Sequence, residues 1–528
     1  MKENTKTNGF AAALDSKFEV SKRGSSVKQE VLAGIGAFLV GVSALLVNTQ
    51  LIGTYYGNYA GSYFGITFVV LLATAVLGVV ANVPVMATAS MGMSTLVLTF
   101  LSANSGLTYA NMMLITLISA VITLVIAASP LKKIFIDALP EGVRKALPAG
   151  VGLYVILKGL QNTGLVSEAG TLASISDLGT LQAFYFWLAL GAILIYAVYL
   201  AVGRKNALGS TYLILIALMW ACGIIFYMES FIGGQTATTV VYERLNLFFA
   251  TDGAQPYNIA NGISSMSFGK VLSEGTNFAA YTEGGGKAAQ LMFTSILTFV
   301  TFGLYSNVGT YEAAAVCGNM ENDENMEKKE KLALMIASAA NIIAPLFGAC
   351  PVEIGAHSSI ATKDGAKTGL ASCTAAVGYL IALFTWFFFA MSATTTNGVG
   401  MWINDTEVKL AAYVQDSFAF NDVIMVLAGV CMLKAFRNFD TKNIENAVPF
   451  IATVFGTAFL GNAAYGAALG LGAYVILKLI GSSRKETNLV TVALAVVLIA
   501  ASVYCIKAGT NFVEVVQQPF GFGGPPGM

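Results

Sequence analysis

Two ionisable side chains stand four residues apart in a segment that is otherwise small and apolar. The segment covers residues 348–370, and the two side chains are Glu353 and His357, the only histidine of the chain. In a helix this spacing places both on one face, where they can pair. In a strand that leads into a half-helix, the amides at the half-helix N-terminus can instead hold an anion or a carbonyl group. Because histidine titrates near neutrality, the pair predicts a proton or ligand site, the alternative being a structural ion pair.

A third ionisable group, Glu312, interrupts the apolar run at 289–317. A carboxylate in apolar surroundings needs a partner or a water-filled cavity. Glu312 therefore joins Glu353 and His357 as a candidate for proton coupling. The alternative is that Glu312 lies near the cytoplasmic end of its helix and is solvated there.

Polar side chains on several apolar segments are the candidates for substrate binding. Such groups are costly in an apolar environment and are usually functional. The substrate-binding candidates are the polar residues Asn48, Gln50, Ser90, Ser306, Asn307, Glu353 and His357, together with the apolar Met91 next to Ser90.

Several classes of site have no signature in the sequence. There is no nucleotide-binding loop, no metal-ligand cluster and no nucleophile triad, and the six cysteines lack metal-ligand spacing. We therefore expect no enzyme, no catalytic residue, no cofactor and no metal. The net charge of zero favours no particular partner, and we expect no nucleic acid.

The elements that carry these residues are membrane spans. Residues 31–131 hold no Asp, Glu, Lys, Arg or His, and the whole chain is 56% hydrophobic and 11% charged. One spanning helix needs roughly 20 apolar residues, so this stretch alone predicts about four spans. Residues 1–30 are polar with no short apolar core, which argues against a cleavable signal peptide. The sequence predicts a multi-pass protein of the plasma membrane, with the lipid bilayer as its surroundings.

Apolar segments predict about fourteen spans. They lie near 31–53, 64–82, 84–100, 107–129, 143–160, 182–203, 207–228, 289–317, 331–349, 350–364, 367–392, 419–435, 446–461 and 464–480. A further apolar helix at 488–507 is either a fifteenth span or an interfacial helix. Short loops alternate between basic and neutral or acidic, which predicts a cytoplasmic N-terminus and an extracellular linker at 229–288.

The two halves of the chain share a short, interrupted segment. Pro84 and Val85 open one such segment, and Pro351 and Val352 open the other, 267 residues further on. Seven spans in each half turn the second half upside down relative to the first. Short Gly/Pro-interrupted segments at matching positions indicate a binding site at the membrane midplane of an inverted-repeat transporter. The alternative is a chance coincidence of two Pro-Val dipeptides.

Several motifs resemble one transporter family. The sequence IDALPEGVRKALPAGVGL at 136–153, continued by GLQNTGLV at 159–166, is similar to the fifth-span region of the adenine/guanine/hypoxanthine permeases. These form a branch of the nucleobase–cation symporter-2 (xanthine/uracil permease) family. Shorter matches are EVLAG at 30–34, VNTQL at 47–51, Met91 and Gly92, Gly309 and Thr310, and KTGL at 367–370.

The resemblance implies an all-α polytopic fold with a seven-plus-seven inverted repeat and short strands in spans 3 and 10. Its core domain would comprise 31–129 (spans 1–4) and 289–392 (spans 8–11). Its gate domain would comprise 143–228 (spans 5–7) and 419–480 (spans 12–14). Residues 1–30 would form a cytoplasmic tail, and 488–528 an extra apolar helix and tail. The family usually moves a nucleobase with a proton, and a homodimer through the gate domain is a further expectation.

The departures from the family pattern fall on its binding residues. Ser306 stands where the eighth-span motif has an acidic residue, and His357 stands where the tenth-span motif has a base-binding Glu. A carboxylate accepts two N–H groups from a purine edge, whereas a neutral imidazole offers one donor and one acceptor. Glu353 and Glu312 could restore carboxylates from other positions. The sequence predicts a proton-coupled or facilitative purine nucleobase permease. Its alternatives are a same-fold transporter of another small solute or organic anion, and a non-transporting membrane scaffold or sensor.

Overall fold

The protein is described as a computed structural model covering residues 9–162, 191–202, 263–384, 420–480 and 489–516. Short gaps within these ranges lie at 57–58, 104–106, 138, 192–193, 200, 265, 279–284, 321–324 and 440–441. Most of predicted span 6, the whole of predicted span 7 and most of the predicted linker at 229–288 therefore lie outside the described residues.

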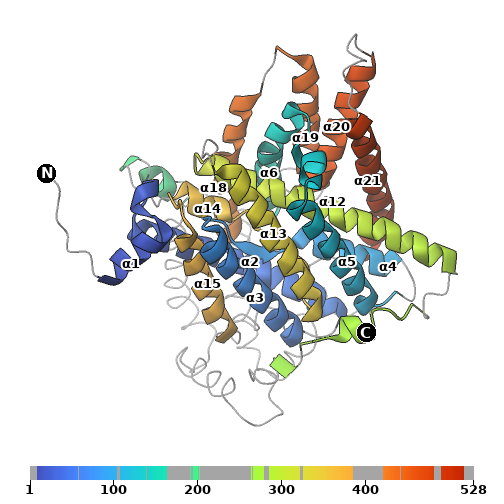
Figure 1. Ribbon diagram of the computed structural model, residues 1–528, viewed down its shortest axis with the longest axis horizontal. Coiled ribbons are helices and arrows are strands. Elements are labelled where there is room, and N and C mark those ends of the chain that lie inside the picture. The colour runs from blue at the N-terminus through green and yellow to red at the C-terminus, as the bar shows by residue number, and fades with distance from the viewer. Residues whose placement is uncertain are drawn as a thin grey trace, which may run out of the picture.

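The described chain is mostly helical (Figure 1). Its first half contains α1 (Gly9–Phe18), η1 (Ser21–Arg23), α2 (Val27–Tyr56), α3 (Tyr59–Val76), η2 (Leu77–Ala81), β1 (Ala87–Ala89), α4 (Met91–Ala103), α5 (Tyr109–Ala128), η3 (Lys133–Asp137) and α6 (Glu141–Asn162). Its second half contains α11 (Lys270–Ser273), α12 (Gly285–Cys317), α13 (Met326–Leu346), β2 (Val352–Ile354), α14 (Ser358–Lys363), α15 (Gly369–Phe384), α18 (Phe420–Met432), η6 (Leu433–Asn438), α19 (Ile444–Leu460), α20 (Ala463–Ile480) and α21 (Leu489–Val516).

Two short strands break the helical pattern, as predicted for spans 3 and 10. Asn82 and Gly348 follow the preceding helical segments within two residues, both have positive φ, and a proline follows each within three residues. β1 pairs with β2 in antiparallel register, with Thr88 opposite Glu353. The pairing continues beyond the strands through hydrogen bonds from Ser90 N to Pro351 O and from Gly355 N to Met86 O. The prediction of paired short segments in the two halves is confirmed.

The helices pack in two groups that meet at α12. α15 packs on α2 and α3, and α5 packs on α13 and α12, whereas α6 packs on α18, α19 and α20. The long α12 also contacts α6 and α20, and it crosses the molecule in Figure 1. Glycines permit the close crossings: a methyl group on Gly150 would lie 2.7 Å from Thr457 of α19. Such small residues are typical of helix contacts in membranes.

Four helical segments of the described chain are long and apolar enough to cross a membrane: Gly61–Ala81, Tyr109–Ala128, Leu291–Cys317 and Ala463–Ile480. Large apolar side chains such as Phe459 and Ile480 are exposed on the outside of α19 and α20, where lipid would cover them. The chain is a multi-pass membrane protein. The apolar segment predicted at 488–507 is helical within α21, which packs against α20, α4 and α12.

The segment before the first span is folded onto the bundle from residue 9 onward. Arg23 donates to Asn82 O at 2.9 Å and to Lys367 O at 3.3 Å. Glu30 accepts from the backbone N–H of Lys367 at 2.7 Å. Hydrogen bonds from Ser21 lower the pKa of the Asp15 carboxylate and fix the turn between α1 and η1. This N-terminal segment thus contacts the loop before β1 and the loop after α14.

Candidate functional site

Glu353 is the carboxylate at the centre of the strand pair. Its Oε2 accepts a hydrogen bond from Ser306 Oγ of α12 at 2.5 Å, and the Ser90 hydroxyl lies beside the same carboxylate. Val352 and Ile354 on either side are fully buried, whereas Glu353 keeps part of its surface accessible. Glu353 is therefore the residue of β2 that is not fully enclosed.

Two amide side chains hold the strand that carries Glu353. Asn341 of α13 accepts from Val352 N at 2.6 Å and donates to Val352 O at 2.7 Å, which completes the edge of β2 as a neighbouring strand would. Asn307 of α12 accepts from Ile354 N at 2.7 Å and donates to Gly303 O at 2.6 Å. Asn307 thus positions β2 through its backbone, while its neighbour Ser306 contacts the carboxylate directly.

The strand of the first half is held in a similar way. Asn48 of α2 donates to Ala44 O at 2.8 Å and to Ala89 O at 3.4 Å, and its Oδ1 is buried without a hydrogen-bond partner. Thr74 of α3 accepts from Ala87 N at 3.1 Å. Ser90 caps α4 by accepting from Met93 N at 3.2 Å. The side chains of Gln50 and Met91 lie outside the described residues.

His357 does not share the environment of Glu353. The strand ends at Ile354 and His357 immediately precedes α14, so the helical pairing of these two residues does not occur and the strand-to-half-helix arrangement does. His357 is 4% exposed, and its Nε2 has no hydrogen-bond partner. A methyl group on Gly41 would lie 3.0 Å from this nitrogen and would overlap the hydroxyl of Tyr379, which is also buried and unpartnered. His357 therefore faces α2 and α15.

Glu312 lies apart from the strand pair, in an ion-pair network. It pairs with Arg144 of α6 at 3.0 Å, and Arg144 also contacts Glu330 of α13 at 3.4 Å. Lys132 lies 3.7 Å from the other oxygen of Glu330. The Glu312 side chain is only 12% exposed, so it is partnered and largely desolvated, in contrast to the solvated alternative.

Two residues of the second helix group, Tyr154 and Asn462, approach the strand pair and the helix α4 that follows β1, and neither was a candidate from the sequence. Tyr154 of α6 lies within electrostatic range of the Glu353 carboxylate. A methyl group on Gly92 would lie 2.7 Å from the ring of Phe302 and 3.7 Å from Asn462 Nδ2. An aromatic residue in an apolar helix and an Asn at a helix start carry little signal, since both are common for structural reasons.

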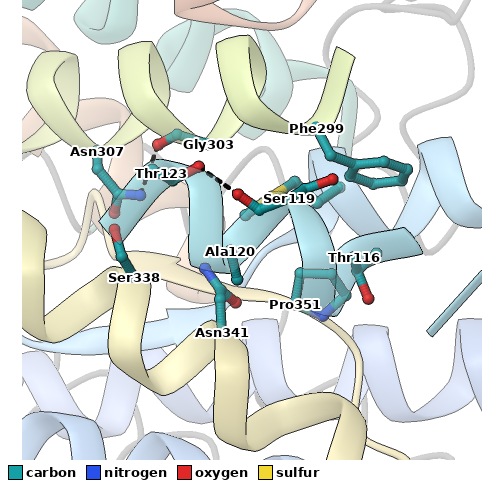
Figure 2. A pocket seen from close by; sticks show the side chains of 11 residues that line it. Thr116, Ser119, Ala120, Thr123, Phe299, Gly303, Asn307, Ser338, Asn341 and Pro351 are labelled. Atoms are coloured by element: carbon teal, nitrogen blue, oxygen red, sulfur yellow. Dashed lines mark hydrogen bonds between the residues drawn. The ribbon is translucent and has the colours of Figure 1, made fainter. Parts of the chain in front are cut away.

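A small cavity lies behind β2, between α5, α12 and α13 (Figure 2). Its volume is about 20 Å³. Its lining residues are Met93, Thr116, Ser119, Ala120, Thr123, Phe299, Gly303, Asn307, Ser338, Asn341 and Pro351. One water molecule needs roughly 10–15 Å³, whereas ligand pockets span about 300 Å³ or more. The cavity therefore suits a water molecule and is too small for an organic ligand.

The structure thus brings Ser90, Ser306 and Glu353 together, with Asn307 and Asn48 as supports of the two strands. It places His357 and Glu312 elsewhere. Within the described residues, no group of His, Cys, Asp or Glu is arranged to hold a metal ion. A partly accessible carboxylate flanked by hydroxyl groups can accept N–H groups from a neutral polar ligand.

Comparisons with known proteins agree with the motif resemblance. The chain is 22% identical over 490 residues to the guanine/hypoxanthine permease PbuO of Bacillus subtilis, covering 91% of this chain and 98% of that protein. It is 22% identical to the guanine/hypoxanthine permease GhxP of Escherichia coli O157:H7, covering 92% and 96%. It is also 22% identical to the adenine permease AdeQ of Escherichia coli K12, covering 92% and 95%. No family model matches the chain.

Among solved structures the likeness is slight. The transmembrane domain of the cyanobacterial bicarbonate transporter BicA has a TM-score of 0.36 and 16% identity, covering 83% of this chain and 97% of that one. The relatives that span nearly the whole chain are permeases and not enzymes, and they confirm the resemblance to the nucleobase–cation symporter-2 family.

Proposed function

We propose that the protein is a secondary transporter of purine nucleobases. The observation that carries this proposal is Glu353, a partly accessible carboxylate on a strand pair between half-helices, in a chain similar along its length to purine permeases. The guanine edge presents a ring N–H beside an amino group, and a carboxylate can accept both. Guanine therefore fits Glu353 better than adenine, whose corresponding ring nitrogen is an acceptor.

Glu353 also accounts for the two missing family carboxylates. Ser306, at the family's acidic position in span 8, donates its hydroxyl hydrogen to Glu353 at 2.5 Å. The negative charge next to α12 is thus supplied by β2 instead of α12. A carboxylate at this place repels anions, which favours a neutral nucleobase over an organic anion.

The remaining site residues are part of the proposal. We assign Ser90 and Ser306 to the polar wall around the base, Asn48 and Asn307 to its support, and Gln50 and Met91 to the neighbouring half-helix. Tyr154 and Asn462 would close the site from the opposite helix group. Glu312, Glu353 and His357 are the proposed proton-coupling residues.

Transport would proceed by movement of a core domain against a gate domain. The core is proposed to comprise 31–129 and 289–392, and the gate 143–228 and 419–480. The packing of α15 on α2 and α3, and of α6 on α18, α19 and α20, supports this division. We further propose a plasma-membrane location with a cytoplasmic N-terminus, an extracellular linker at 229–288, and a homodimer formed through the gate.

Uptake measurements test the function. Labelled guanine, hypoxanthine, adenine, xanthine, uracil and urate are offered to bacterial cells that lack their own nucleobase permeases and express the protein. We expect uptake of guanine and hypoxanthine above that of the other bases, and its loss in Glu353→Gln. Expression of the variant at the membrane, checked by blotting, is the control. Equal and negligible uptake of all six bases by the wild-type protein would contradict the proposal.

A further inference from the structure

Four charged side chains meet in a largely buried network at one end of α12. They are Lys132, which follows α5, Arg144 of α6, Glu312 of α12 and Glu330 of α13. Glu330 is 1% exposed and Lys132 is 9% exposed at the side chain. We call these four residues the Arg144 network.

The Arg144 network crosses the boundary between the proposed domains. Arg144 is its member from the gate, whereas Lys132, Glu312 and Glu330 belong to the core side. The segment from Lys132 to Lys145 contains four basic residues, Lys132, Lys133, Arg144 and Lys145, which predicts that this end of α12 lies on the cytoplasmic side. Movement of the core against the gate must therefore separate Arg144 from its two carboxylates.

The charges of the Arg144 network balance only while Arg144 is in place. Among the described side chains, these two carboxylates face one guanidinium and one ammonium group, so the four engaged groups together are neutral. Without Arg144, the two carboxylates and Lys132 together carry one net negative charge. An uncompensated buried charge is strongly unfavourable, and a carboxylate in that position takes up a proton.

We propose that Glu312 and Glu330 form a proton-binding site for which Arg144 competes. When Arg144 is engaged, the two carboxylates hold no proton. When the core moves away, one proton from water binds a carboxylate oxygen of this pair, and the pair carries one negative charge that Lys132 balances. Return of Arg144 releases the proton to water. The site would link one proton to each cycle of the core, and it rests on the proposed transport function.

This proton site differs from the nucleobase site around Glu353. Ser306, which contacts Glu353, lies on the same helix as Glu312, about one and a half turns away. Because α12 carries both, a shift of α12 acts on the base and on the Arg144 network at once. Substrate movement and proton movement are thus coupled through one rigid helix and without direct contact.

With the purified protein in liposomes, proton-driven accumulation of guanine and simple exchange of guanine can be measured separately. With one proton moved per base, a gradient of about one pH unit supports about tenfold accumulation, because equal concentration ratios have equal free energies. Counterflow exchange of labelled for unlabelled guanine needs no net proton movement. We expect Glu312→Gln to abolish accumulation and to leave counterflow within about twofold of the wild-type rate, since the core then stays neutral without a proton.

A second pair of variants distinguishes the loss of proton coupling from a loss of folding. Arg144→Gln alone leaves one carboxylate uncompensated and is expected to lower stability and to lose accumulation. Arg144→Gln with Glu312→Gln restores neutrality, and we expect this double variant to recover stability and counterflow but not accumulation. Lys145→Gln is the matched control: Lys145 follows Arg144 in the same helix but pairs with the exposed Glu141. It should accumulate guanine like the wild type.

Cys317 supplies a readout that needs no substrate. It ends α12, is 3% exposed, and lies near Cys431 and Lys434 on the gate side. Alkylation of Cys317, measured by mass spectrometry and normalised to unfolded protein at each pH, should rise on acidification in the wild type and in Lys145→Gln. In the neutral double variant it should be high at every pH.

The outcomes distinguish the two proposals. If wild-type protein transports no nucleobase but Cys317 alkylation depends on pH through Glu312, the proposed function fails and the proton site stands. If guanine is transported and both Glu312→Gln and the double variant accumulate it like the wild type, the proton site is refuted. Wild-type alkylation of Cys317 that is independent of pH would refute it as well.

Discussion

The two strands at the centre of the molecule have similar supports and different chemistry. β1 is held by Asn48 and Thr74, and β2 by Asn307 and Asn341, each pair coming from the first and second predicted span of its own half. Every side chain of β1 is buried, whereas Glu353 at the middle of β2 is partly accessible. Under the proposed function, the repeated scaffold would fix where a ligand binds, and Glu353 in the second copy would determine which ligand it is.

The largest expected effect comes from removing the negative charge of Glu353, which distinguishes β2 from β1. Glu353→Gln keeps the size and polarity of the side chain but loses its charge. Two hydrogen bonds to a charged acceptor contribute about 3 kcal/mol together, which corresponds to about 100-fold in affinity. We expect guanine uptake at low concentration to fall by that factor. The matched control is Thr88→Val on β1, directly opposite Glu353. This variant should change guanine uptake by less than about threefold.

A carboxylate moved back to α12 should repair part of that loss. Ser306→Asp in the Glu353→Gln background restores a negative charge next to β2, at the position where the family keeps one. We expect about a tenfold recovery of uptake, corresponding to about 1.4 kcal/mol. Ser306→Asn in the same background has the shape without the charge and is the control. Recovery by both variants alike would show that charge is not what Glu353 provides.

The supports of the strands should differ in strength. Asn341 makes two hydrogen bonds to β2, and Thr74 makes one to β1. Asn341→Leu should therefore lower the free energy of unfolding by about 2 kcal/mol and Thr74→Val by about 1 kcal/mol. Thermal unfolding of the purified variants in detergent measures both. A larger loss for Thr74→Val would reverse the comparison.

The smallest effect is expected at the buried groups next to α14. His357→Gln keeps one donor and one acceptor but cannot titrate. We expect guanine binding to persist and the pH profile of uptake to change, measured in cells over a range of external pH. Tyr379→Phe, which removes the unpartnered hydroxyl beside Gly41, is the control and should leave the pH profile as it is. If His357→Ala leaves both the pH profile of uptake and the affinity for guanine unchanged, His357 has only a packing role.

The sequence predicted the strand pair but not its contacts. Proline and the half-chain spacing located both short segments, because backbone chemistry is local. The contact between Ser306 and Glu353 spans 47 residues, and it depends on how α12 lies against β2. The basic residues of the short loops were used only to predict the topology, and nothing in the sequence indicated that Arg144 pairs with Glu312, 168 residues away. Tyr154 and Asn462 have residue types that are as common in packing as in binding.

The N-terminal segment gives the strand pair a mechanical property. Arg23 reaches the backbone of Asn82, before β1, and of Lys367, after α14, so it ties together loops from both halves. The two strands come from separate repeats and share only a few backbone bonds, which alone would let them shear under load. The hydrogen bonds of Arg23 across one end of the two strands hold the pair together as one rigid unit. In the proposed transport cycle, the residues around a base beside Glu353 would then keep their relative positions. Movement of the core would displace the binding site as a unit without deforming it.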